Sequence, residues 1–231
     1  MSIADVIKDL HASIQNIAIN SDHHPGAVKL VIVTKTVPVE KIREAYDAGE
    51  RDFGENRVQE WQDKKDVLPS DIRWHLIGHL QTNKVKYVVG KVHLIHSLDR
   101  IELADEIERQ AVKQGIQEVP CLLQVNMSGE DTKFGVAPES AEELVVQIAE
   151  RTRIKLKGIM TIGPFTDDEK KVRECFLETR ELFDTLQAEY PQHPWEIVSM
   201  GMSNDYRIAI EEGSNMLRIG TLIFGERNKQ V

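Results

Sequence analysis

Three observations in the sequence predict a (β/α)8 barrel. Short apolar runs alternate with amphipathic helical segments about eight times along the 231 residues. Strands that alternate with helices run parallel, because a crossover between parallel strands needs a helix. Eight such units in a chain of this length match a closed barrel, with an open doubly wound sheet as the alternative. No linker or shift in composition divides the sequence, so we expect one domain over residues 1–231.

The pattern predicts each element in turn, beginning with an extra N-terminal helix. One apolar stripe at helical spacing precedes the first strand, formed by Ile3, Val6, Ile7, Leu10, Ile14 and Ile17. Buried strands are expected at 30–33, 51–53, 74–77, 92–96, 121–125, 157–160, 196–199 and 216–219. Helices are expected around 38–48, 58–62, 84–89, 101–111, 144–148, 172–186 and 208–211. Thr166 with Glu169 matches a capping box before the 172–186 helix.

Composition excludes several classes of protein. The formal net charge of −9 argues against a nucleic-acid-binding protein, which normally has a basic face. No apolar run approaches the roughly 20 residues that a membrane span needs. Asp5 and Lys8 interrupt any signal-peptide core, so we expect a cytoplasmic protein. Cys121 and Cys175 form no CxxC pair, and we expect both thiols to be reduced and buried.

Lys35 is the most informative single position for chemistry. It lies just past the first predicted strand, and the carboxyl ends of the strands carry the chemistry of such barrels. A lysine whose pKa is lowered there becomes a nucleophile that forms imines with aldehydes and ketones. The alternative for Lys35 alone is a lysine that extends from a strand end into solvent.

The segments after the seventh and eighth strands have the composition of a phosphate cradle. Gly201 and Ser203 follow the seventh strand, and Gly220 with Thr221 follows the eighth. Small residues and hydroxyls let backbone N–H groups close around a phosphate, and loops at these two positions commonly do so in barrels. The alternative is that the glycines serve only as turns. Asp205 replaces the last glycine of a serine-hydrolase elbow and excludes that motif.

An imine-forming lysine opposite a phosphate cradle points to a phosphorylated carbonyl compound. Two candidates follow: pyridoxal 5'-phosphate (PLP) held on Lys35, or a sugar phosphate handled as in a class I aldolase.

The histidines do not predict a metal site. The pair His75 and His79 straddles a strand end, and the pair His93 and His96 is expected to point to opposite sides of a strand. Neither pair has a carboxylate-rich or Cys-rich neighbour in the sequence, so we expect no bound metal.

Five segments, in order along the chain, carry a family resemblance. They are VTKT at 33–36, FGENRVQE at 53–60, WHLIGHLQTNK at 74–84, MGMSND at 200–205 and RIGTLIFG at 218–225. They resemble the pyridoxal phosphate homeostasis protein family, single-domain relatives of the alanine racemase N-terminal barrel. The resemblance runs from about Lys29 to Gly225, and no motif position departs from the pattern.

The resemblance implies a (β/α)8 TIM barrel of the alanine racemase N-terminal domain type, with PLP as a Schiff base on Lys35. It implies a phosphate held by Ser203, Gly220 and Thr221, and Arg218 near the pyridine nitrogen. The remaining residues that it places around the ring are Asn56, Ser199, Met200 and, nearby in the barrel, His75. The alternative for His75 is a core histidine with its hydrogen bonds satisfied.

The resemblance also implies a PLP carrier or regulator rather than an enzyme. A guanidinium beside the ring nitrogen disfavours ring protonation and weakens the cofactor as an electron sink. The sequence ends six residues after Gly225, so we expect no second domain of the racemase kind. The expected role is to buffer PLP and supply it to PLP-dependent apoenzymes, as a monomer. The alternative is a PLP-dependent amino-acid racemase, with Tyr206 or His75 as the second acid/base.

Overall fold

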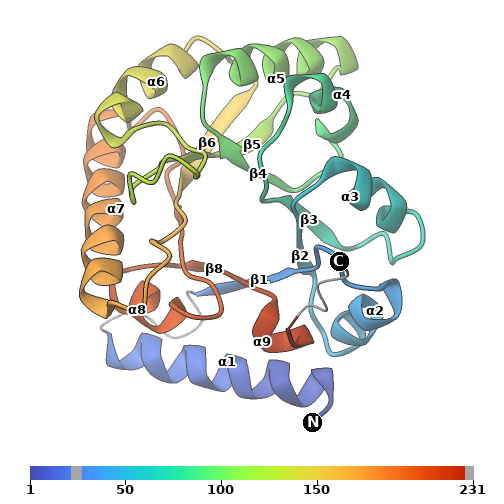
Figure 1. The fold of residues 1–231 in the computed structure, drawn as a ribbon. Coiled ribbons are helices and arrows are strands. Elements are labelled where there is room, and N and C mark those ends of the chain that lie inside the picture. The colour runs from blue at the N-terminus through green and yellow to red at the C-terminus, as the bar shows by residue number, and fades with distance from the viewer. Residues whose placement is uncertain (22–27, 227–231) are drawn as a thin grey trace.

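The computed structural model describes residues 1–21 and 28–226, and its parallel strands close into a barrel (Figure 1). The sheet order is β1-β2-β3-β4-β5-β6-β7-β8, with β8 paired to β1. The strands are β1 (Lys29–Val33), β2 (Asp52–Glu55), β3 (Arg73–Leu76), β4 (Leu94–Leu98), β5 (Val119–Gln124), β6 (Ile154–Met160), β7 (Ile197–Ser199) and β8 (Met216–Ile219). The predicted barrel is therefore confirmed, and the open sheet is excluded.

Helices surround the barrel, as the alternating pattern predicts (Figure 1). They are α1 (Ile3–Asn20), α2 (Val39–Asp47), α3 (Val58–Lys65), α4 (Val85–Val88), α5 (Ile101–Gln114), α6 (Ala141–Ile148), α7 (Glu169–Glu189), α8 (Tyr206–Glu211) and α9 (Thr221–Phe224), with 3-10 turns η1 (Thr82–Lys84) and η2 (Pro138–Ser140). In the described residues no helix is both long enough and apolar enough to cross a membrane.

The extra helix α1 completes the outer ring. The helix after β8 is the single turn α9, which is too short to cover the seam between β8 and β1. Helix α1 contacts α2, α8 and α9 and lies across that seam (Figure 1). It buries Ile7, Leu10 and Ile14, three members of the stripe that predicted it.

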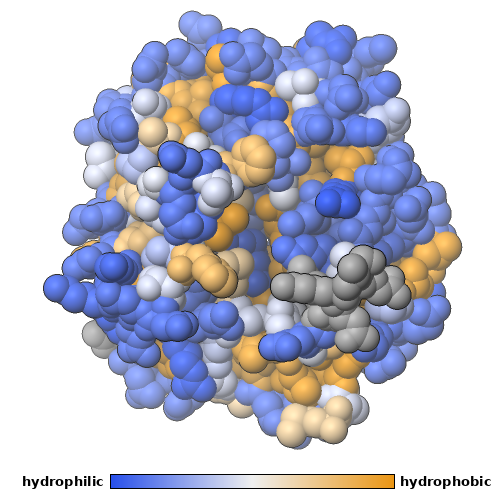
Figure 2. All heavy atoms as spheres, viewed as in Figure 1, coloured by the Kyte–Doolittle hydropathy of each residue, from blue (hydrophilic) through white to orange (hydrophobic). Residues whose placement is uncertain are grey.

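Two apolar clusters separate the inside of the barrel from its outside. The larger contains residues of both strands and helices, such as Phe53 and Phe176, and lies between the sheet and the helices. In the smaller, every fully buried member comes from a strand: Val31, Leu94, Leu122, Met160 and Met216. This smaller cluster therefore lies within the barrel. Hydrophilic residues cover most of the outer surface on the face in Figure 2.

Three local predictions need correction. The fourth strand spans Leu94–Leu98 rather than 92–96, so His96 lies at its middle and not at its end. The helix expected over 84–89 is only the short pair η1 and α4. The capping box is also wrong: the side chain of Asp168 caps α7, while the Thr166 hydroxyl accepts from the Asp168 amide. Both cysteines are buried and free, as predicted.

Candidate functional site

Eight of the nine predicted site residues lie at one rim of the barrel. Lys35 and Asn56 follow β1 and β2, Ser199 ends β7, and Arg218 is the third residue of β8. The other four lie in the segments after β7 and β8: Met200, Ser203, Gly220 and Thr221. All strands are parallel and the sheet is closed, so these carboxyl ends meet at the same opening. His75 is the exception, because it lies within β3.

The segments after β7 and β8 join each other and the end of β1. The amide of Leu222 donates to the Ser203 hydroxyl over 3.3 Å, which brings Ser203 beside the start of α9 at Gly220 and Thr221. A Cβ atom on Gly220 would lie only 2.9 Å from the carbonyl oxygen of Val33. Gly220 thus lets β8 approach the strand end that leads to Lys35.

Arg218 is a buried cation held at two points. Its guanidinium donates to the Ser199 hydroxyl at 2.6 Å and to the Thr161 carbonyl at 2.7 Å. Burial lowers the pKa of Arg218 to about 10, against the opposing effect of Asp205. Arg218 therefore keeps its charge at neutral pH, at the same end of the barrel as Lys35.

A buried lysine fixes the backbone beside Lys35. The Lys64 ammonium group donates to the Thr34 carbonyl at 2.8 Å, to Glu55 at 2.6 Å and to Glu60 at 2.8 Å. The Thr34 hydroxyl donates to the same Glu55 oxygen at 2.6 Å. Burial raises the pKa of Glu55, although the hydrogen bonds from Lys64 and Thr34 lower it. The end of β1 is therefore anchored to α3 from outside the barrel.

Backbone strain follows directly after Lys35. Thr36 has a φ of 61°, and it is the only non-glycine residue with positive φ within 1–21 and 28–226. This conformation is unfavourable for a β-branched residue, and it persists only where surrounding contacts enforce it. The hydrogen bond from the Thr36 amide to Glu60 is one such contact. Strained backbone of this kind is common at functional sites.

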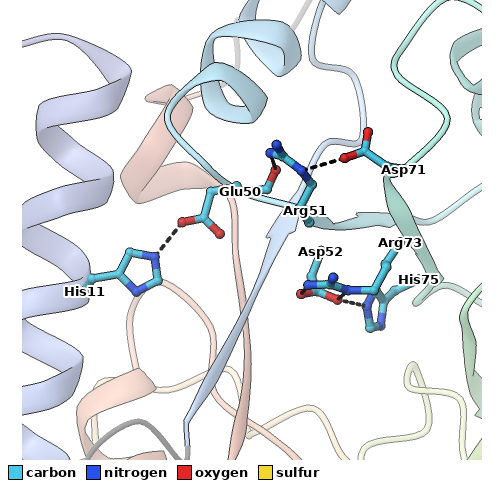
Figure 3. A network of polar contacts seen from close by, with 7 residues as sticks. All are labelled: His11, Glu50, Arg51, Asp52, Asp71, Arg73 and His75. Carbon is cyan, nitrogen blue, oxygen red and sulfur yellow. Dashed lines mark hydrogen bonds and ion pairs between the residues drawn. The ribbon is translucent and has the colours of Figure 1, made fainter.

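His75 has both ring nitrogens engaged inside the protein. Nε2 lies 3.0 Å from Asp52, and Nδ1 lies 2.9 Å from Nε2 of His96. Figure 3 shows the contact between His75 and Asp52, and the ion pair between Asp52 and Arg73. His96 Nδ1 in turn lies 3.3 Å from the Ser199 hydroxyl. His75 is thus a core histidine with its hydrogen bonds satisfied, and His96 and Ser199 connect it to the rim.

The expectation that His93 and His96 point apart is wrong. The ring centroids of His93 and His96 lie 5.4 and 5.1 Å from that of His75. His93 comes before β4, so the alternation of side chains along the strand does not apply to it. The fold also brings a carboxylate from a distant part of the sequence to these histidines, since ligand atoms of Asp52, His75 and His93 lie within 4.8 Å of one another. However, the Arg73 guanidinium already binds both oxygens of Asp52, at 2.9 and 2.5 Å.

Two residues near the rim have positions that the sequence did not reveal. The Met200 side chain is fully buried in the larger apolar cluster, outside the barrel, so only its backbone faces the rim segment. His79 stacks on Phe134, with ring centroids 4.0 Å apart. Asp52 and His96 were not singled out as site residues, although polar residues inside otherwise apolar strands were a signal that could have found them.

Comparison with known proteins gives a consistent relationship. Residues 8–228 match the family profile of the alanine racemase N-terminal domain. A protein of Aquifex aeolicus named "pyridoxal phosphate homeostasis protein" is 52% identical over 204 residues, covering 87% of this chain and 88% of that protein. The chain belongs to the pyridoxal phosphate homeostasis protein family.

Solved structures agree with this family. PipY of Synechococcus elongatus, with PLP bound, is 33% identical, has a TM-score of 0.84, and the match covers 97% of this chain and all of PipY. Alanine racemase of Clostridium difficile has a TM-score of 0.73 over 96% of this chain and 61% of its own length. Its 14% identity shows a shared fold alone.

Proposed function

We propose that this chain binds PLP at the barrel rim through Lys35 and acts in intracellular PLP homeostasis without robust catalysis. The observation that carries the proposal is a buried, charged Arg218 at the same rim as Lys35 and the Ser203, Gly220 and Thr221 segments. A family member, PipY, has a structure with PLP bound. We place the cofactor in the corresponding position of this chain.

The residues present at the rim fit the chemical groups of PLP. PLP supplies an aldehyde that condenses with amines and can be passed to another amine. The Lys35 amine would be its anchor, and Ser203, Thr221 and the open backbone at Gly220 would hold the phosphate. Arg218 would face the pyridine nitrogen as a donor that keeps its own proton. Asn56, Ser199 and Met200 would border the ring.

A carrier role is favoured over a racemase because neither candidate for the second acid/base is available. The Tyr206 hydroxyl lies 3.1 Å from that of Ser13 on α1, outside the barrel. Both nitrogens of His75 are used within the protein. Two-sided proton transfer needs one group on each face of the substrate. We therefore propose a monomeric, cytoplasmic protein that holds PLP and releases it to PLP-dependent apoenzymes.

The absorption spectrum of the purified protein with added PLP is the first test. We expect a visible band that borohydride abolishes, and peptide mapping that places the reduced pyridoxyl group on Lys35. The Lys35→Ala variant should lose the band, while Lys29→Ala, at the opposite end of the same strand, should keep it. A colourless wild-type protein that takes up no PLP would overturn the proposal.

A second test addresses the phosphate and the absence of catalysis. Ser203→Ala combined with Thr221→Ala should weaken PLP binding by a few kcal/mol, because hydrogen bonds to charged groups contribute about 1.5–3 kcal/mol each. The exposed Ser70→Ala change is the matched control. Unchanged affinity in the double variant would show that the phosphate lies elsewhere. High turnover in a chiral assay across amino acids, lost in Lys35→Ala, would favour the racemase.

A further inference from the structure

Polar side chains form one unbroken hydrogen-bonded chain through the barrel interior, from its amino-terminal opening to Arg218 at the rim. The members are Arg73, Asp52, His75, His96, Ser199 and Arg218, contributed by β2, β3, β4, β7 and β8. The side chain of Arg73 is 46% exposed, whereas Asp52, His75, His96, Ser199 and Arg218 are all buried. One end of the chain thus reaches solvent, and the other reaches the proposed cofactor site.

The strand register explains why these side chains meet. His75 is paired with Leu94 and Arg218 with Val31, and both of these apolar partners belong to the cluster inside the barrel. His96 comes two residues after Leu94 and so points to the same side of its strand. The chain therefore replaces part of the apolar filling of the barrel.

The positions of the protons follow from the two ends. Because ionised Asp52 can only accept, His75 Nε2 must carry the hydrogen, and its Nδ1 then accepts from His96 Nε2. His96 Nδ1 must in turn accept the Ser199 hydroxyl hydrogen, which leaves the Ser199 oxygen to accept from Arg218. From Arg218 through Ser199, His96 and His75, every donor points towards the Asp52 carboxylate.

The opposite arrangement breaks the chain. A hydrogen on His75 Nδ1 would require His96 Nε2 to accept, so that His96 Nδ1 would donate to Ser199. The Ser199 oxygen would then receive two donors, and its own hydrogen would lose its acceptor in the barrel interior. An unpaired buried hydroxyl is costly.

We propose that Asp52, His75 and His96 are positioning residues that orient the Ser199 hydroxyl and thereby fix the Arg218 guanidinium at the rim. The ligand that Arg218 meets rests on the proposed function, but the proton arrangement does not. Both imidazoles are neutral and carry the hydrogen on Nε2. The groups that face His75 are Asp52, Lys29 and Arg73, and those that face His96 are His75, His93 and Arg218. Asp205 faces Arg218. Except for Asp52, the groups that face the two histidines disfavour an added proton on them.

Nitrogen-15 NMR of the histidine rings in the full chain without PLP tests the proton arrangement. We expect His75 and His96 to show the neutral Nε2–H tautomer, unchanged between pH 5.5 and 8.5. Exposed His93 serves as an internal reference from the same region. An imidazolium or an Nδ1–H tautomer at His75 or His96 would overturn the proposal.

Two substitutions of His96 separate hydrogen bonding from packing. His96→Gln retains a donor NH2 group and an acceptor oxygen at the end of an uncharged side chain, whereas His96→Phe retains only the volume. We expect the dissociation constant of PLP to rise at least tenfold in His96→Phe, and to stay within threefold in His96→Gln and in the control His93→Phe. Equal losses in both His96 variants, or none in His96→Phe, would contradict a positioning role.

The two readouts keep this inference distinct from the proposed function. A wild-type protein that binds no PLP refutes the proposed function, while the tautomers remain a test of the chain of hydrogen bonds. Normal PLP binding with the wrong tautomers refutes the positioning chain alone. If His96→Phe does not fold, the wild-type and His96→Gln spectra still decide the matter.

Discussion

Replacing His96 by glutamine should make the protein less sensitive to acid. Burial, together with the nearby His75 and Arg218, holds the pKa of His96 well below its usual value. In the unfolded chain His96 titrates near its ordinary value of about 6.5. Below that pH the unfolded chain binds a proton that the folded chain excludes. The stability that His96 contributes is therefore complete above pH 6.5 and is lost as the pH falls.

The size of the effect follows from one proton. A pH of 5.0 is about 1.5 units below the pKa of His96 in the unfolded chain. Protonation of His96 therefore stabilises the unfolded state by about 2 kcal/mol, because the folded state keeps this histidine neutral. His96→Gln removes this gain. Whatever destabilisation the variant shows at pH 7.5, the difference in unfolding free energy between it and the wild type should shift by about 2 kcal/mol in its favour at pH 5.0.

Urea unfolding followed by tryptophan fluorescence measures this difference at both pH values. His11→Gln is a control of opposite sign. The hydrogen bond from His11 to Glu50 raises the pKa of His11 despite partial burial, so its stabilisation is present at low pH and lost as the pH rises (Figure 3). A difference between wild type and His96→Gln that is the same at pH 7.5 and 5.0 would refute the neutral, buried imidazole.

Three further predictions follow from buried groups. Lys64→Met should lower the unfolding free energy by about 3–5 kcal/mol, because it leaves Glu55 buried without its cation; urea unfolding measures this, and a loss under 1 kcal/mol would contradict it. Neither thiol should react with Ellman's reagent before denaturation, because burial raises the pKa of Cys175 to about 11 and that of Cys121 further; rapid reaction in native buffer would be the contrary result. Gly158→Ala should abolish soluble expression, because a Cβ there would lie 1.8 Å from a β7 carbonyl oxygen; a native circular dichroism spectrum would count against this reasoning.

The barrel could be predicted from the sequence because each of its strands and helices can be recognised within a short segment. Each strand is a short apolar run, and each crossover helix has its own stripe, so alternation alone indicates parallel pairing. The placement of α1 could not be predicted in this way. It depends on α9 being a single turn, which leaves the seam between β8 and β1 for another helix to cover.

The position of the rim residues at the strand ends was also predictable, but the chain of hydrogen bonds inside the barrel was not. Lys35, Ser203 and Gly220 come within four residues of the ends of β1, β7 and β8, and strand ends can be recognised from composition. Asp52 and His96 lie inside strands, and their partners come from neighbouring strands whose register is set only when the barrel closes. Placing the end of the fourth strand at His96 instead of Leu98 hid the inward direction of its side chain.

The polar chain is best understood as a consequence of burying Arg218. An apolar filling like Leu122 or Met160 would be more stable by itself, because buried polar groups must be fully hydrogen-bonded to break even. A guanidinium inside the barrel changes that balance, since each unpaired donor would be costly. Ser199 can accept from Arg218 without cost only if its own hydrogen has an acceptor, which is His96. The hydrogen on His96 then needs His75 as its acceptor, and the hydrogen on His75 needs the Asp52 carboxylate. A charge needed at the rim thus determines side chains at the opposite end of the barrel.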